Sequence, residues 1–156
     1  MTLIYTTEIF FLPKFIKIGC RVMSVIMLGM AGVTFTQLSV SPVLIFIAFT
    51  FLFLAWSMFA YSRLHLIISD NALVFKGGLK PHDIDWKTIY KVDMQEAGKY
   101  DDLQTVVHYN DRKLKIAHSF YLKRQYKQIL QLLEMKIAPE LFTPKYYQLK
   151  EKRLKA

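Results

Sequence analysis

The chain has 156 residues, of which 53% are hydrophobic and 21% are charged, and its formal net charge at pH 7 is +9. This length leaves room for one small domain beside an anchor and excludes a two-domain enzyme. The single cysteine, Cys20, excludes an intrachain disulfide.

The first residues, MTLIYTTEIFF, are mostly β-branched and aromatic and are too few to cross a membrane. We expect residues 1–13 to form a strand or an interfacial segment, which Pro13 separates from the following helix. A strand here would pair with the soluble domain, because both are expected on the same side of the bilayer.

No charged residue occurs between Val22 and Ser62. One span needs about 20 apolar residues, so this segment is long enough for two spans and a tight turn. Ser39-Val40-Ser41-Pro42 interrupts the segment, with Ser41 suited to a helix N-cap and Pro42 to the first helical position. Residues 14–62 therefore predict a two-helix transmembrane hairpin, with spans near 18–38 and 42–61.

Lysine and arginine flank this hairpin and are absent from its turn. The positive-inside tendency predicts a multi-pass protein of the bacterial inner membrane with both termini in the cytoplasm. A cleaved signal peptide is disfavoured, because a second apolar segment follows the first at once. The cations before the first span, which we expect to meet anionic headgroups, are Lys14, Lys17 and Arg21.

Small residues recur on one face of each predicted span, where they would let the two backbones approach closely. We predict helix–helix packing at Gly29, Gly32, Ala48 and Ala55. No ionisable side chain lies deep in either span, which disfavours an ion pathway.

From Arg63 onward the apolar period is that of strands. Turns are expected at Asp70-Asn71, Gly77-Gly78 and Asn110-Asp111, with a kink near Lys87-Thr88. Five or so antiparallel strands are followed by an amphipathic helix from about 120 to 136, capped by Ser119. Residues 63–138 therefore predict a cytoplasmic α+β domain, and residues 139–156 a basic C-terminal tail, frayed near the headgroups.

Motifs for catalysis or metal binding do not occur. There is no phosphate loop, dinucleotide fingerprint or nucleophile elbow, and the histidines lack ligand spacing. Asp83 and Asp85 are interpreted as solvated strand residues. We expect no catalytic residue, no cofactor and no metal.

Basic side chains of the soluble domain are candidates for contact with a membrane surface or an anion. They are Arg112, Lys113 and Lys115 near the last predicted hairpin and Lys123, Arg124 and Lys127 on the predicted helix. We expect the partners to be the anionic inner leaflet and a protein, either a different protein or a second copy of the chain. A small anionic ligand is the alternative, and nucleic acid is disfavoured, because tyrosine among lysines suits headgroups equally well.

Three segments carry a resemblance to a known group: LIISDNALVFKGG from Leu66, IDWKTIYKV from Ile84 and YLKRQYKQILQLL from Tyr121. The chain resembles bacterial two-helix membrane proteins with a cytoplasmic pleckstrin-homology-like domain, a bent antiparallel sheet or small barrel closed by one C-terminal helix. The resemblance covers roughly 1–137. It implies a non-enzymatic module that binds a protein partner or scaffolds a membrane complex. Asp70 stands in the loop where the lipid-binding eukaryotic version of this domain carries a basic cluster, which argues against phosphoinositide recognition.

The layout is also similar to that of antiphage defence effectors, in which membrane helices are joined to a small β-barrel that senses a cyclic nucleotide. A ligand-gated membrane effector is therefore the alternative function, and a membrane immunity protein is a third. Tight nucleotide binding with ligand-driven oligomerisation would distinguish the effector from the scaffold.

Overall fold

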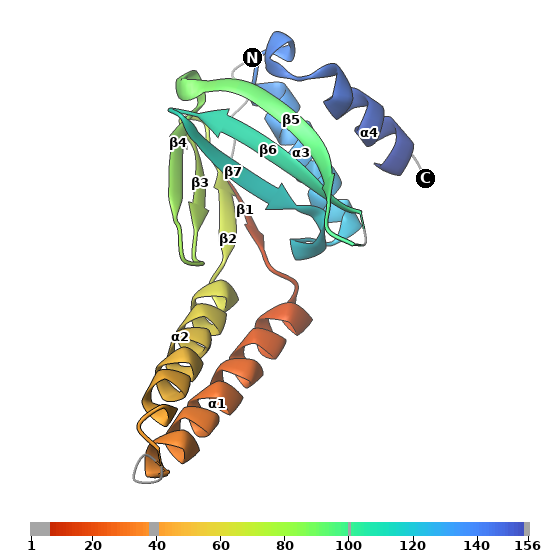
Figure 1. The fold of residues 1–156 in the computed structure, drawn as a ribbon. Helices are drawn as coiled ribbons and strands as arrows, with labels where there is room; N and C mark the ends of the chain where they lie inside the picture. The colour runs from red at the N-terminus through yellow and green to blue at the C-terminus, as the bar shows by residue number, and fades with distance from the viewer. Residues whose placement is uncertain (1–6, 38–40, 100, 155–156) are drawn as a thin grey trace. The chain divides into compact units, whose positions relative to one another are not determined.

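The computed structural model describes residues 7–37, 41–99 and 101–154 (Figure 1). The chain divides into two compact units. The first, the hairpin unit, comprises Leu12–His65 and Lys76–Pro81. The second, the sheet domain, comprises the segment that ends at Phe11, then Leu66–Phe75, and the chain from His82 onward.

The hairpin unit is built on two long helices, α1 (Lys14–Thr36) and α2 (Leu44–Ser62). The strands are β1 (Glu8–Phe11), β2 (His65–Ile68), β3 (Ala72–Lys76), β4 (His82–Asp85), β5 (Ile89–Ala97), β6 (Asp102–Tyr109) and β7 (Arg112–Ala117). The helices of the sheet domain are α3 (Lys123–Lys136), α4 (Pro144–Leu154) and the short 3-10 turns Trp86–Thr88, His118–Phe120 and Pro139–Leu141.

The two long helices pack through small residues spaced seven apart. Ser24 and Ala31 are buried on α1, and Ala48 and Ala55 are buried on α2. The Ser24 hydroxyl donates a 2.9 Å hydrogen bond across the contact to the carbonyl oxygen of Ala55. A seven-residue repeat is typical of helices that cross at a shallow angle.

The structure corrects the prediction for Gly29 and Gly32. Both are exposed, and a Cβ atom added to either would have no neighbour within 4 Å. At 3.6 residues per turn, Gly29 lies about 140° around the helix from Ser24. The contact follows the seven-residue repeat, so these glycines lie outside it.

The helix boundaries also differ from those predicted for the spans. α1 begins at Lys14, directly after Pro13, whose extended backbone precedes the first turn. Lys14 and Lys17 therefore lie within α1, which begins about four residues before the predicted span. The turn predicted at 39–42 lies partly outside the described residues. The carbonyl oxygens of Ser41 and Pro42 accept from the amides of Leu44 and Ile45 at 3.1 and 3.2 Å, without a Ser41 side-chain cap.

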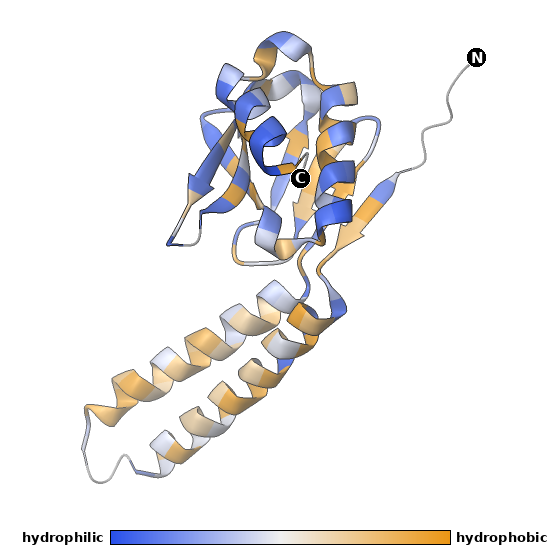
Figure 2. Cartoon of the chain, turned by 90° about the vertical axis from the view of Figure 1, so that its right-hand side faces the viewer, coloured by the Kyte–Doolittle hydropathy of each residue, from blue (hydrophilic) through white to orange (hydrophobic). Residues whose placement is uncertain are grey.

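The residues of the hairpin helices are mostly hydrophobic (Figure 2), and many of their large apolar side chains are exposed. Both helices are long and apolar enough to cross a membrane. Five of their hydroxyl groups donate to a backbone carbonyl about one turn earlier in the same helix, at 2.7–2.8 Å for Thr34, Thr36, Thr50, Ser57 and Ser62. Such bonds satisfy a hydroxyl donor without a partner from water.

The sheet domain contains two sheets, with strand orders β1-β2-β3-β4 and β5-β6-β7. β1 neighbours β2 although both long helices separate them in the sequence. The predicted turns join β2 to β3, β3 to β4 and β6 to β7. Asn110 and Asp111 have φ angles of 39° and 57°, as a two-residue hairpin turn that matches the twist of its strands requires.

The core of the domain lies between the sheets and α3. Tyr126, Ile129, Leu130 and Leu133 are buried on one stripe of α3, which covers one face of β5–β7 (Figure 1). The predicted Ser119 cap is not formed, because the Ser119 hydroxyl donates instead to Asp102, at 2.8 Å.

A bulge occurs at the start of β5. Ile89 pairs with Tyr109 and Lys91 pairs with His108, so Tyr90 is the additional residue. Tyr90 and Lys91 are consequently both exposed, whereas regular alternation would place them on opposite faces. The kink expected near Lys87-Thr88 corresponds to the short 3-10 turn that precedes this bulge.

The predicted basic tail is instead part of the sheet domain. Phe142, Tyr146 and Leu154 are buried. Phe142 forms a parallel bridge with Val92 of β5, and the Thr143 amide donates to the Val92 carbonyl oxygen at 3.0 Å. The apolar side chains that fix α4 are few and lie among many lysines, so composition alone suggested a solvated segment.

Candidate functional site

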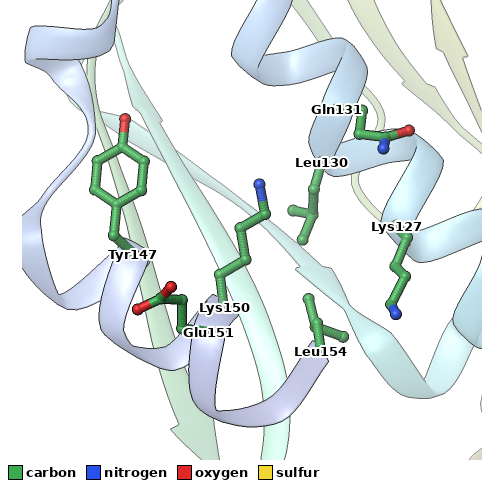
Figure 3. Close-up of a pocket in the computed structure, with 7 residues that line it drawn as sticks. All are labelled: Lys127, Leu130, Gln131, Tyr147, Lys150, Glu151 and Leu154. Atoms are coloured by element: carbon green, nitrogen blue, oxygen red, sulfur yellow. The ribbon is translucent and has the colours of Figure 1, made fainter. Parts of the chain in front are cut away.

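A groove of about 520 Å³ lies between α3 and α4. Figure 3 shows Leu130 of α3 and Leu154 of α4 pointing into the space between the two helices. Both leucines are buried, so they form an apolar floor. The polar side chains around it are Lys127 and Gln131 from α3, and Tyr147, Lys150 and Glu151 from α4.

Glu134 of α3 binds two side chains of α4, the helix that forms the other wall of this groove. Its carboxylate accepts a 2.9 Å hydrogen bond from the Tyr146 hydroxyl and 2.6 Å bonds from the Lys150 ammonium group to both oxygens. Tyr146 is fully buried, whereas Lys150 and Glu134 are about one-third and one-quarter exposed. The hydrogen bond to the buried tyrosine therefore fixes α4 more firmly than the partly exposed ion pair does.

A second tie joins the C-terminal part of α4 to β5. The Arg153 guanidinium group contacts Glu96 at 2.7 and 2.8 Å. This hydrogen bond is the main reason why the pKa of Glu96 lies below its ordinary value, and burial acts in the opposite direction. Because Glu96 is exposed, the pair orients α4 more than it stabilises the fold.

Both groove walls are basic. α3 carries Lys123, Arg124, Lys127 and Lys136 against Glu134, and α4 carries Lys145, Lys150, Lys152 and Arg153 against Glu151. Lys127, at the rim, forms no salt bridge with a carboxylate in the described part of the chain. An apolar floor between two basic helices is complementary to apolar anchors flanked by acidic residues.

The predicted basic residues are not brought together in one site. The structure places them in three regions: Lys14, Lys17 and Arg21 on α1; Lys123, Arg124 and Lys127 on α3; and Arg112, Lys113 and Lys115 on β7. Of these, Lys127 lines the groove, and Lys113 and Lys115 lie on the opposite face of β7 from the buried Leu114. Arg112 lies beside Tyr109 at the hairpin turn, where it opposes the rise that burial causes in the pKa of the Tyr109 phenol.

Sequence reasoning missed the α4 side of the groove: Tyr147, Lys150 and Leu154. A signal for it was present, because Tyr146 and Leu154 are eight residues apart. That spacing predicts one buried helical stripe, but the density of lysine concealed it.

Two buried tyrosines of the core differ in their hydrogen bonding. The Tyr126 hydroxyl lies 2.7 Å from the Thr105 hydroxyl, and burial raises the pKa of Tyr126 to about 12. Burial also raises the pKa of Tyr121, whose hydroxyl has no hydrogen-bond partner among the described residues. Tyr121 is thus a polar group buried at a cost.

Within the described ranges, no group of three or more His, Cys, Asp or Glu side chains could hold a metal ion. Comparisons of the chain with protein-family models, with curated proteins and with solved structures find no match.

Proposed function

We propose that this chain is a non-enzymatic integral protein of the bacterial inner membrane whose sheet domain binds a protein partner on the cytoplasmic side. The observation that carries the proposal is the apolar exterior of α1 and α2, whose hydroxyl groups donate to backbone carbonyls of the same helix. Exposed apolar surface on this scale is stable in hydrocarbon and would aggregate in water.

The strand order supports an even number of membrane crossings. β1 and β2 are neighbours in one sheet, and the chain between them is the α1–α2 hairpin. Paired strands must share one side of a bilayer, so the hairpin crosses it twice. The lysines and arginines on its flanks favour the cytoplasm as that side.

We interpret the domain as pleckstrin-homology-like. This interpretation is supported by strands that follow one another in sequence order within each sheet and by the amphipathic α3 that succeeds them. In such a domain the rigid sheets position binding surfaces, and the anchor raises the effective concentration of those surfaces for partners at the membrane.

The groove between α3 and α4 indicates the chemistry of the partner. Leu130 and Leu154 provide the apolar floor, and Lys127 provides positive charge at the rim. The volume suits a few anchoring side chains of a peptide. We therefore propose an acidic amphipathic segment of another protein as the occupant.

Membrane integration is tested by washing membranes that contain the full-length protein with alkaline carbonate. We expect the protein to remain in the pellet and to be released by detergent. Release by carbonate alone would contradict the proposed anchor.

Partner binding is tested in cells with a photocross-linking amino acid at Gln131, which lines the groove. The matched control is the same amino acid at Gln128, which is exposed on α3 outside it. We expect a discrete adduct from position 131 only, mapped by mass spectrometry to an acidic amphipathic segment. Lys127→Glu should remove it, whereas Arg124→Glu, outside the groove, should not. Equal adducts from both positions, or an adduct with a second copy of this chain, would refute the proposed occupant.

A further inference from the structure

The face of β5–β7 that points away from α3 concentrates positive charge. Lys91, His108 and Lys113 form one row across the three strands, and Lys115 lies in the next row, opposite Val106. These side chains line a hollow of about 250 Å³. At the β5 bulge, beside this hollow, the ring centroid of the exposed Tyr90 lies 5.9 Å from that of His108.

Asp93 is the only carboxylate that lines this hollow within the described chain, and it is already engaged. It accepts a 2.6 Å hydrogen bond from the Thr143 hydroxyl and a 2.9 Å bond from the Met94 amide. No salt bridge joins Lys91, Lys113 or Lys115 to a carboxylate in the described part of the chain. The hollow therefore has an excess of positive charge.

His108 reports on that charge. Burial lowers the pKa of its imidazole, and the ammonium groups of Lys113 and Lys91 lower it further, whereas Asp93 acts in the opposite direction. These effects favour the neutral imidazole, which can form a hydrogen bond without adding charge. An anion bound among these lysines would raise the pKa of the His108 imidazole, because its negative charge would offset theirs.

We propose that this hollow binds a phosphate group, held by the ammonium groups of Lys91, Lys113 and Lys115 beside the His108 imidazole. Lysine binds phosphate as a point charge, and several lysines around one concave surface concentrate that field. The hollow is smaller than sites for whole drug-sized ligands, so it suits one charged group. The phosphate belongs either to a soluble molecule or to a lipid headgroup. The hollow shares no lining residue with the groove between α3 and α4.

The test follows the His108 imidazole of the full-length protein by NMR, with His118 as a reference in the same spectra. In one arm, inorganic phosphate is added at constant ionic strength to protein in uncharged detergent micelles. In the other, protein without added phosphate is compared in nanodiscs of phosphatidylcholine and in nanodiscs that also contain phosphatidylglycerol.

Binding should raise the pKa of His108 and leave the imidazole chemical shifts of His118 unchanged at constant pH. A saturable response to inorganic phosphate assigns a soluble source, and a response only to phosphatidylglycerol assigns a headgroup. In the arm that responds, Lys91→Gln and Lys113→Gln should each weaken binding about fivefold, as expected for one partly exposed ion pair. Lys87→Gln, exposed on the turn before β5, should have no effect. No response in either arm, or equal effects of all three substitutions, would overturn the proposal.

Discussion

At the scale of single residues, hydrogen bonding distinguishes two buried tyrosines that look alike in the sequence. Tyr121 and Tyr126 lie five residues apart and both are buried, yet the Tyr126 hydroxyl has the Thr105 hydroxyl as a partner. The Tyr121 hydroxyl has none among the described residues. Their contributions to stability should therefore have opposite signs.

Replacing each tyrosine by phenylalanine tests this difference. We expect Tyr126→Phe to lower the free energy of unfolding by roughly 1–2 kcal/mol, because it leaves the buried Thr105 hydroxyl unpaired. Tyr121→Phe should leave that free energy unchanged or raise it by up to about 1 kcal/mol. Urea unfolding of the full-length protein in micelles, followed by Trp86 fluorescence in a Trp56→Phe background, measures both. A loss for Tyr121→Phe as large as that for Tyr126→Phe would contradict the assignment.

The same burial predicts a loss of stability at alkaline pH. The pKa of Tyr126 is raised from 10 to about 12 in the folded protein. Between these values the unfolded chain releases the phenolic proton and the folded chain keeps it, so stability falls as pH rises. Below pH 10 this group contributes no pH dependence. The free energy of unfolding is measured by urea titration at several pH values from 9 to 11.5. Tyr126→Phe should make its fall with pH less steep, by at most about 1.4 kcal/mol per pH unit. An unchanged slope would show that Tyr126 does not retain its proton.

At the scale of elements, the sequence predicted those features that depend on local pattern. The strand period from Leu64 and the turns at Asp70-Asn71 and Asn110-Asp111 are local, and the structure has them. The face of α1 that meets α2, the bulge at Tyr90 and the docking of α4 depend on distant parts of the chain. Small-residue spacing alone could not distinguish Gly29 from Ser24, because both lie on apolar turns and only tertiary packing selects one.

The hairpin contact can be tested with the same substitution on two faces of the helices. Ala55→Leu introduces a large side chain where α1 and α2 are in contact, and overpacking typically costs about 1–3 kcal/mol. Gly32→Leu adds the side chain to open space and also removes a helix-weakening glycine. We expect Ala55→Leu alone to lower the SDS concentration at which helicity is lost, followed by circular dichroism. If Gly32→Leu were more sensitive to SDS than Ala55→Leu, the helices would be in contact through the glycine face instead.

The docking of α4 predicts a contrast between two adjacent tyrosines. Tyr146 is fully buried and bonded to Glu134, whereas Tyr147 is 44% exposed. Tyr146→Ala should cost about 3–5 kcal/mol, as for other large aromatic side chains removed from a core. Tyr147→Ala should cost about 1 kcal/mol or less, for its ring contacts with Phe142 and Tyr146. If both substitutions had similarly small effects on the free energy of unfolding in urea, α4 would be loosely attached, as the sequence predicted.

At the scale of the whole molecule, the α1–α2 hairpin is an insertion between two neighbouring strands. β1 precedes the hairpin and β2 follows it, so the pairing of these strands brings the two ends of the hairpin together. The sequence predicted the hairpin from its apolar length, but it could not show that β1 pairs with β2. Strand pairing across so long a separation leaves no local pattern.

The most direct test of the account uses the uniqueness of Cys20. In a Cys20→Ser background, single cysteines are introduced by Ser41→Cys near the turn of the hairpin and by Gln128→Cys on the exposed side of α3. Spheroplasts are then treated with a membrane-impermeant maleimide before and after lysis. The account predicts that Ser41→Cys reacts in intact spheroplasts and that Gln128→Cys reacts only after lysis. Reaction of Gln128→Cys in intact spheroplasts, or of Ser41→Cys only after lysis, would contradict it.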